Sequence, residues 1–233
     1  MSLRLMALTG LCAFAVNARA QFDGNFYHAR YGLTDTDQKL VNNRGEGYED
    51  LYGVRNFREV IKGVMFRGGA NNLYHRDNAR ANANPLPNDG LQNLCEEGFK
   101  TAVYLYTTNF NTAPKTTSCT SLRGPNTLDY RQMTFSSQYK EILQLVYAAI
   151  LNPEAGPVYV HCWNGWHASG MLSAMAFRQF CGWSGDKAVA YWVRNADGTD
   201  NGAYESIKQR IRNFQPYPEM LLDTATQNRV CPN

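Results

Sequence analysis

A cysteine stands at the start of a short loop that the sequence places between a strand and a helix. The segment reads Val158-Tyr-Val-His-Cys-Trp-Asn-Gly-Trp-His-Ala-Ser-Gly170, which predicts a buried strand over 158–161 and a helix over 169–180. In such a turn, successive backbone N–H groups and the positive end of the following helix form a binding site for an anion. The same field favours the thiolate form of cysteine, which is the nucleophile. Cys162 therefore indicates nucleophilic chemistry on an anionic substrate.

This segment resembles the signature loop of the cysteine-based phosphatases, the tyrosine and dual-specificity superfamily, written His-Cys-x-x-Gly-x-x-Arg-Ser/Thr-Gly. Five positions are in register, namely His161, Cys162, Gly165, Ser169 and Gly170, whereas Ala168 occupies the position of the arginine. Three earlier segments also resemble bacterial dual-specificity-type phosphatases: Asn56-Phe-Arg58, Phe66-Arg-Gly-Gly69 and residues 90–99. The resemblance covers about residues 50–195. It implies an α/β fold, a mainly parallel sheet of four or five strands flanked by helices, with the loop at the C-terminal end of a strand.

The resemblance also implies roles for the loop residues. Cys162 is the expected nucleophile, Ser169 is expected to hold or assist it, and His161 is expected to orient it. His167 lies beside the vacant arginine position and is the expected substitute donor or acid; alternatively, it only orders the loop. The expected ligand-binding residues are Trp163, Asn164, Gly165, Trp166, Ala168 and Gly170.

Two parts of the phosphatase machinery are absent from their expected places. Ala168 cannot supply the bidentate fork that arginine offers to two phosphate oxygens. The expected general acid is an aspartate before the long helix, but residues 134–138 (Thr-Phe-Ser-Ser-Gln) contain no carboxylate, and Asp129 is the nearest one. Arg67 or Arg131 could replace the missing fork from a neighbouring strand. The sequence therefore predicts an atypical site with impaired or altered chemistry.

Other interpretations of the same residues stay open. Trp163 and Trp166 either stack on a flat ligand or pack in the core. His161, Cys162 and His167 are donors that zinc or copper accepts. However, the phosphatase loop already explains their spacing, so we expect neither a metal nor another cofactor.

The first twenty residues are expected to be a signal peptide. Arg4 precedes a short apolar run, and Ala18-Arg-Ala20 matches a cleavage pattern, so the exported chain would start near Gln21. The run is too short for a permanent membrane helix, and no membrane anchor is expected after removal. Residues 21–233 then carry 21 basic and 20 acidic residues. This balance argues against nucleic-acid binding and leaves a phosphorylated or other anionic small molecule or peptide as the expected partner.

Export predicts a periplasmic or secreted protein, in a compartment where disulfides form. Five cysteines lie beyond the signal peptide, which suggests two disulfides and one free thiol. We expect Cys162 to be free and the pairs to be Cys95 with Cys119 and Cys181 with Cys231, although four cysteines allow three connectivities.

The remaining pattern defines the elements that would position the loop. Residues 21–50 are expected to form an N-terminal extension and residues 51–233 the phosphatase-like domain. Strands are expected over 54–57, 64–66, 101–106 and 130–133, with a long polar loop over 109–126. Helices are expected after a cap at Asp89, over 137–151, after a cap at Ser184, around 204–211, and over 216–226.

Three functional hypotheses follow. The chain is an exported enzyme that acts through Cys162 on a phosphate ester or related anion. Alternatively, it is a catalytically inactive pseudophosphatase that binds a phosphorylated or other anionic ligand, or a structural or interaction protein in which Cys162 is a thiol without a chemical role.

Overall fold

A computed structural model of the protein describes residues 25–232. The expected signal peptide and the expected start of the exported chain at Gln21 lie outside the described residues. Within residues 25–232, no helix is long and apolar enough to cross a membrane.

The centre of the molecule is one six-stranded sheet with the order β1-β2-β6-β3-β5-β4. Its strands are β1 (Val54–Ile61), β2 (Met65–Ala70), β3 (Thr101–Tyr104), β4 (Thr116–Ser121), β5 (Gly124–Gln132) and β6 (Val158–Cys162). The four inner strands β2, β6, β3 and β5 run parallel, and the two edge strands pair antiparallel with their neighbours. The predicted mainly parallel α/β class is confirmed, with one strand more than expected.

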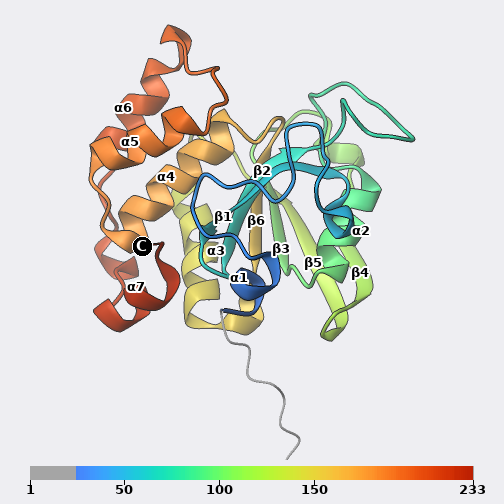
Figure 1. Ribbon diagram of the computed structural model, residues 1–233, viewed down its shortest axis with the longest axis horizontal. Helices are drawn as coiled ribbons and strands as arrows, with labels where there is room; N and C mark the ends of the chain where they lie inside the picture. Colours follow the sequence, from blue (N-terminus) through green and yellow to red (C-terminus); the bar gives the residue numbers. More distant parts are fainter. Residues whose placement is uncertain (1–24, 233) are drawn as a thin grey trace, which may run out of the picture.

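Helices cover both faces of this sheet. They are α1 (Asn25–Tyr31), α2 (Asn88–Glu96), α3 (Tyr139–Leu151), α4 (His167–Cys181), α5 (Gly185–Arg194), α6 (Glu205–Asn213) and α7 (Thr224–Val230). In Figure 1, α4 to α7 gather on one side of the sheet and α2 lies across the sheet from them. The side chains of β6 alternate between the two cores, as a strand buried on both faces requires. Val158, Val160 and Cys162 join the core under α3 to α6, whereas Tyr159 joins the aromatic core under α1 and α2.

Residues 25–50 pack onto the sheet and are part of the aromatic core. Tyr27 and Tyr31 of α1 are buried, and their rings contact Phe66 of β2 edge to face. Val41 forms an isolated antiparallel bridge with Phe57 of β1. This segment therefore contacts β1, which pairs with β2 and lies two strands from β6 in the sheet.

Three local predictions differ from the structure. The expected polar loop over 109–126 contains β4 and the start of β5. Exposed and half-buried positions alternate along β4, so its threonines and serines suit an edge strand that needs only one covered face. Pro87, rather than Asp89, occupies the N-cap of α2, and Asp89 instead hydrogen-bonds His75. The helix expected over 216–226 is replaced by a short 3-10 turn (Pro218–Met220) and the start of α7, which begins at Thr224 after a cap at Asp223.

Both predicted disulfides are present. Cys95 bonds to Cys119 and ties α2 to β4, and Cys181 bonds to Cys231 and ties the end of α4 to the end of α7. Cys162 is the free cysteine of the described residues, and it is buried.

Candidate functional site

The candidate site is the loop between β6 and α4, at the C-terminal edge of the parallel strands. β6 ends at Cys162, and α4 begins at His167, two residues earlier than predicted. Gly165 turns the loop with a φ of +77°, a left-handed conformation that favours glycine. A Cβ there would lie 2.6 Å from the backbone carbon of Gly68 and 2.8 Å from the backbone nitrogen of Gly69. The loop is therefore pressed onto β2, and only glycine fits at its turn.

Cys162 and Ser169 face each other across the loop. Cys162 Sγ lies 3.4 Å from Ser169 Oγ, and the cysteine is 3% exposed. Ser169 lies in the first turn of α4, so the thiol sits at the positive end of this helix. The arrangement provides a hydroxyl that exchanges a hydrogen bond with the sulfur.

His161 is fixed beneath the loop by a chain of hydrogen bonds. Its Nδ1 donates to the Cys162 carbonyl oxygen at 3.1 Å, and its Nε2 accepts from the Tyr130 hydroxyl at 2.8 Å. The Leu86 backbone N–H donates in turn to the Tyr130 oxygen at 3.0 Å. Complete burial lowers the pKa of His161 to about 3, so the ring is neutral at ordinary pH. His161 therefore holds the backbone at Cys162 in place.

His167 is held by the segment that follows α5. Its Nε2 lies 2.8 Å from Thr199 Oγ1 and 3.0 Å from the Thr199 carbonyl oxygen, and its ring stacks on Tyr204 with centroids 3.8 Å apart. Burial lowers its pKa below the ordinary value for histidine. These contacts occupy the Nε2 atom of the ring. They favour the interpretation that His167 orders the start of α4.

The two tryptophans lie on either side of the turn and are half-buried. Trp163 Nε1 donates to the Tyr104 hydroxyl at 2.9 Å, and its ring lies 4.5 Å from that of Tyr106. Trp166 Nε1 is buried and finds no acceptor among the described residues. Trp163 therefore packs against aromatic residues at and just after the end of β3, whereas Trp166 has an unused donor beside the loop.

Position 168, where the resemblance predicts an arginine, is closed. Ala168 is 0% exposed and belongs to the apolar core that also contains Met171 and Leu172. Gly170, one turn into α4, lies close to Trp192, whose Cδ1 would be 3.1 Å from an added Cβ. The first turn of α4 is therefore packed against α5 and the core.

Neither arginine predicted as a replacement reaches the anion side of the loop. Arg67 is fully buried, and its Nη2 donates to the carbonyl oxygens of Gly165 and Trp166, while its Nη1 donates to the Tyr191 hydroxyl at 2.9 Å. It braces the loop through its carbonyl groups. Arg131 is exposed and forms an ion pair with Asp129 at 2.6 Å.

Asp129 also lies at the wrong end of the sheet to act as the acid. It pairs in register with Thr101, which pairs with Val158 at the start of β6. The loop instead follows the row that contains Tyr104, Gln132 and His161. Successive strand residues rise about 3.3 Å each, so three residues separate Asp129 from the site row by about 10 Å.

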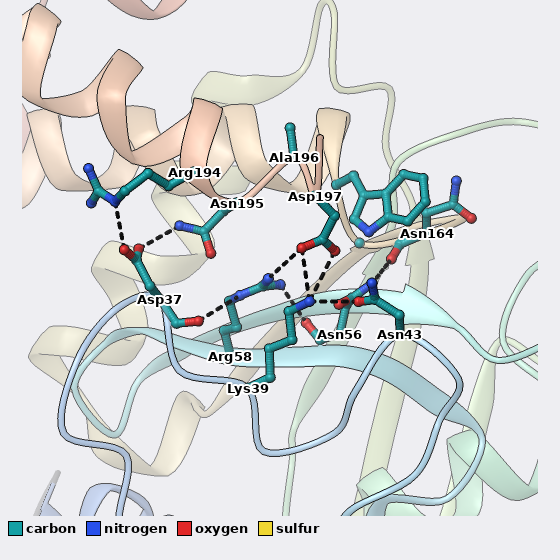
Figure 2. Close-up of polar contacts among 12 residues, drawn as sticks. Asp37, Lys39, Asn43, Asn56, Arg58, Asn164, Arg194, Asn195, Ala196 and Asp197 are labelled. Carbon is teal, nitrogen blue, oxygen red and sulfur yellow. Dashed lines mark hydrogen bonds and ion pairs between the residues drawn. The ribbon is translucent and has the colours of Figure 1, made fainter. Parts of the chain in front are cut away.

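A polar network that the sequence did not reveal supports the loop from the side of β1 (Figure 2). Asn56 Nδ2 donates to the Asn164 carbonyl oxygen at 2.7 Å, and Arg58 Nη1 donates to the Asn56 carbonyl oxygen at 3.3 Å. Asp197 forms ion pairs with Lys39 at 2.9 Å and with Arg58 at 3.8 Å. Burial lowers the pKa of Arg58 to about 10, and the nearby charge of Arg67 acts in the same direction.

The same network joins distant parts of the chain. Asp37 accepts hydrogen bonds from Arg194 and Asn195, both at 2.6 Å. Together with the Lys39–Asp197 pair, this fastens residues 37–39 to the end of α5 and the turn after it (Figure 2). No spacing in the sequence could have identified pairs that are more than 150 residues apart. The described residues contain no group of three or more histidine, cysteine or acidic side chains arranged to bind a metal ion.

No family model matches the chain, and no curated protein sequence matches it significantly. Among solved structures, the core catalytic domain of the PP-IP phosphatase SIW14 from S. cerevisiae in complex with citrate is similar, with a TM-score of 0.44 and 17% identity over 69% of this chain and 86% of that one. Tk-PTP in its active form gives a TM-score of 0.40 and 16% identity, covering 67% of this chain and 98% of that one. TpbA of P. aeruginosa in complex with pTyr gives a TM-score of 0.37 and 15% identity, covering 72% of this chain and 96% of that one. At these values the activity of this chain has to be inferred from its own residues.

Proposed function

We propose that this protein is an exported, atypical member of the cysteine-phosphatase superfamily that acts through Cys162 on a phosphate ester or related anion. The observation that carries the proposal is the position of the thiol: Cys162 ends the central strand β6, begins a glycine-turned loop, and lies 3.4 Å from Ser169 in the first turn of α4. Backbone N–H groups at this place are suited to bind an oxyanion in front of the sulfur.

The reaction would begin with attack of the Cys162 thiolate on phosphorus. The S–P bond forms as the P–O bond to the leaving group breaks, and water then cleaves the thiophosphate to release inorganic phosphate. His161 fixes the backbone of the nucleophile, and Arg67 fixes the carbonyl groups of the loop, so that its N–H groups can point toward the anion. The missing arginine and the missing acid would each lower the rate, by about 10² to 10³ and about 10² to 10⁴ respectively.

Export is part of the proposal. Two disulfides are compatible with an oxidising compartment such as a periplasm or the extracellular space. Residues 1–20 have the pattern of a signal peptide.

The first test is release of inorganic phosphate from aryl phosphate, phosphopeptides, nucleotides and inositol phosphates by the chain without residues 1–20. Release that is lost in Cys162→Ser would support a cysteine-dependent phosphatase. Ser169→Ala is the matched variant, because it removes the hydroxyl near sulfur and leaves the thiol in place. We expect it to slow release without abolishing it. Release that is equal in wild type and Cys162→Ser would contradict the proposal.

The alternative is a catalytically inactive protein that binds a phosphorylated ligand in the same loop. The closed position of Ala168 and the displacement of Asp129 from the loop favour it. Binding of inorganic phosphate by both wild type and Cys162→Ser, without phosphate release from any ester, would identify this function. Measurement of the unfolding temperature with and without phosphate provides the binding readout, since a ligand that binds only the folded chain raises it.

A further inference from the structure

Arg55 is a buried guanidinium beside the candidate loop. It lies on β1, where its backbone pairs with Gly69 of β2, and Gly69 forms a bridge with Asn164 of the loop. Three segments of backbone thus lie side by side, and Arg55 is separated from the nucleophile loop by a single strand. The residue is 3% exposed.

The guanidinium has no negatively charged partner among its hydrogen-bond acceptors in residues 25–232. Nη2 donates to the side-chain oxygen of Asn164 and, at 3.4 Å, to that of Asn82, and Nη1 donates to the Asn43 carbonyl oxygen at 3.4 Å. All three acceptors are neutral. Nε is buried and has no acceptor in the described chain. A buried cation that is left with an unused donor carries a large desolvation cost, which an anionic ligand would offset.

The surroundings of Arg55 are rich in donors and aromatic surface. Asn82 Nδ2 also donates to Asn164 Oδ1, at 2.6 Å, so two donors converge on this one loop side chain. The Arg55 guanidinium lies 5.6 Å from the ring centroid of Tyr74, and that of Arg44 lies 5.4 Å from the same ring. Tyr74 is partly exposed and forms the outer boundary of the cluster.

Arg55 is also electrostatically linked to the nucleophile. Burial lowers the pKa of Arg55 from its ordinary value, and the charge of Cys162 acts on it in the opposite direction. The other two buried arginines near the loop have stronger ties to the protein, although Arg67 Nε, like Arg55 Nε, has no acceptor in the described chain. Arg67 donates to loop carbonyl oxygens and to Tyr191, and Arg58 lies near the carboxylate of Asp197.

We infer that Arg55 binds the oxyanion of the ligand at the Cys162 loop, in place of the arginine that the loop itself lacks at Ala168. The inference rests on the proposed function, because it assigns a phosphate or a similar tetrahedral anion to this loop. Arg55 Nε and Nη2 form two donors of one planar fork, which suits two oxygens of one anion. Asn164 Oδ1 occupies part of this fork, so its side chain would turn away as the anion binds.

The test measures the affinity for inorganic phosphate by calorimetry in wild type, Arg55→Met, Arg55→Lys and Arg131→Met. Arg131→Met is the matched control, because it removes an exposed arginine at a distance from the loop. We expect about 10- to 100-fold weaker binding in Arg55→Met, the range expected for a lost charged hydrogen bond. Arg55→Lys, which keeps the charge and loses the fork, should lie between, and Arg131→Met should bind like wild type.

Two results would overturn the inference: a folded Arg55→Met variant that binds phosphate within twofold of wild type, or a wild type that does not bind phosphate. If Arg55→Met does not fold, Arg55→Lys decides the question. Weaker phosphate binding by Arg55→Lys at an unchanged unfolding temperature supports the inference, and an affinity of Arg55→Lys equal to that of wild type contradicts it.

Catalysis separates this inference from the proposed function. Cys162-dependent phosphate release with an unchanged KM in Arg55→Met would leave the phosphatase proposal intact and remove Arg55 from it. Phosphate binding that depends on Arg55, without release from any ester, would support the role of Arg55 and contradict the enzymatic proposal.

Discussion

Placing an arginine at position 168, where the resemblance to the cysteine-based phosphatases predicts one, by Ala168→Arg should destabilise the protein and should not increase phosphate release. Ala168 is 0% exposed and shares the apolar core with Met171 and Leu172. A longer side chain at a packed position costs about 1–3 kcal/mol in overpacking. A buried charge without a partner adds roughly 3–5 kcal/mol. The expected total of about 4–8 kcal/mol is comparable with the whole stability of a typical domain, about 5–15 kcal/mol.

Ala168→Met is the matched control for this substitution, because it adds a long side chain without a charge. In a domain of this size 1 kcal/mol lowers the unfolding temperature by about 2–4 °C. Ala168→Met should therefore unfold about 2–12 °C below wild type, and Ala168→Arg about 8–32 °C below wild type or not fold at all. Differential scanning calorimetry provides the unfolding temperature, and phosphate release from an aryl phosphate provides the activity. An Ala168→Arg variant that unfolds like wild type and releases phosphate faster would refute the reasoning, because position 168 would then face the ligand.

Three further changes test the construction of the loop and of the core. Gly165→Ala should cost at least twice the stability lost in Gly182→Ala. Both glycines have a positive φ, which costs about 1–2 kcal/mol for alanine. Only at Gly165 would the new Cβ also meet backbone atoms. Equal losses of stability in chemical denaturation would contradict the close packing of the loop on β2. The pKa of His161 is depressed to about 3, so its contribution to stability is complete above pH 6.5 and is lost as the pH falls towards 3. Between pH 7 and pH 5 the free energy of unfolding should fall by about 2 kcal/mol from this group. His161→Gln should shrink the difference between urea unfolding at pH 7 and pH 5, and an unchanged difference would mean that other groups cause it. Replacement of both Cys181 and Cys231 by serine should cost about 4 kcal/mol, as expected for a closed loop of about 50 residues, and a loss below about 1 kcal/mol would show that α7 adds little to the fold.

The sequence predicted the centre of the molecule better than its edges. The strand–loop–helix at Cys162 was predictable because a buried parallel strand is continuously apolar and because the loop has a required glycine. The serine cap of α5 was also predictable, since Ser184 accepts from the Lys187 N–H as such caps do. The edge strand β4 was missed because it is covered on one face only and is built from threonine and serine, which are equally common in loops.

The candidate site was predictable only where its parts are close in the chain. Cys162 and Ser169 lie seven residues apart, at the two ends of one loop, and this spacing was visible in the sequence. The orientation of His167 depends on Thr199, which lies 32 residues later, and no pattern in the sequence connects the two. The Lys39–Asp197 pair, 158 residues apart, exists only because α5 ends beside β1. The aromatic surroundings of His161 likewise come from strands β3 and β5, which pair with or near β6 only in the folded chain.

Buried arginines from β1 and β2 offer a physical reason why the loop has no arginine at position 168. A cysteine loop that holds an oxyanion needs cationic donors, but they need not belong to the loop. Arg55, Arg58 and Arg67 come from β1 and β2, all are at least 97% buried, and each contacts the loop or a residue that contacts it. A further guanidinium at position 168 would add volume and an unpaired charge to the apolar core that contains Ala168. Arg55 and Arg67 each keep a buried Nε without an acceptor in residues 25–232. Arg67 Nη2, however, is bound to backbone carbonyl oxygens of the loop, and Arg58 lies near the carboxylate of Asp197. Arg55 Nη2 donates to the side-chain oxygens of Asn164 and Asn82, which can turn away from it. The ligand would then be recognised from the side of β1, across Asn164, and not from within the helical turn that follows the loop.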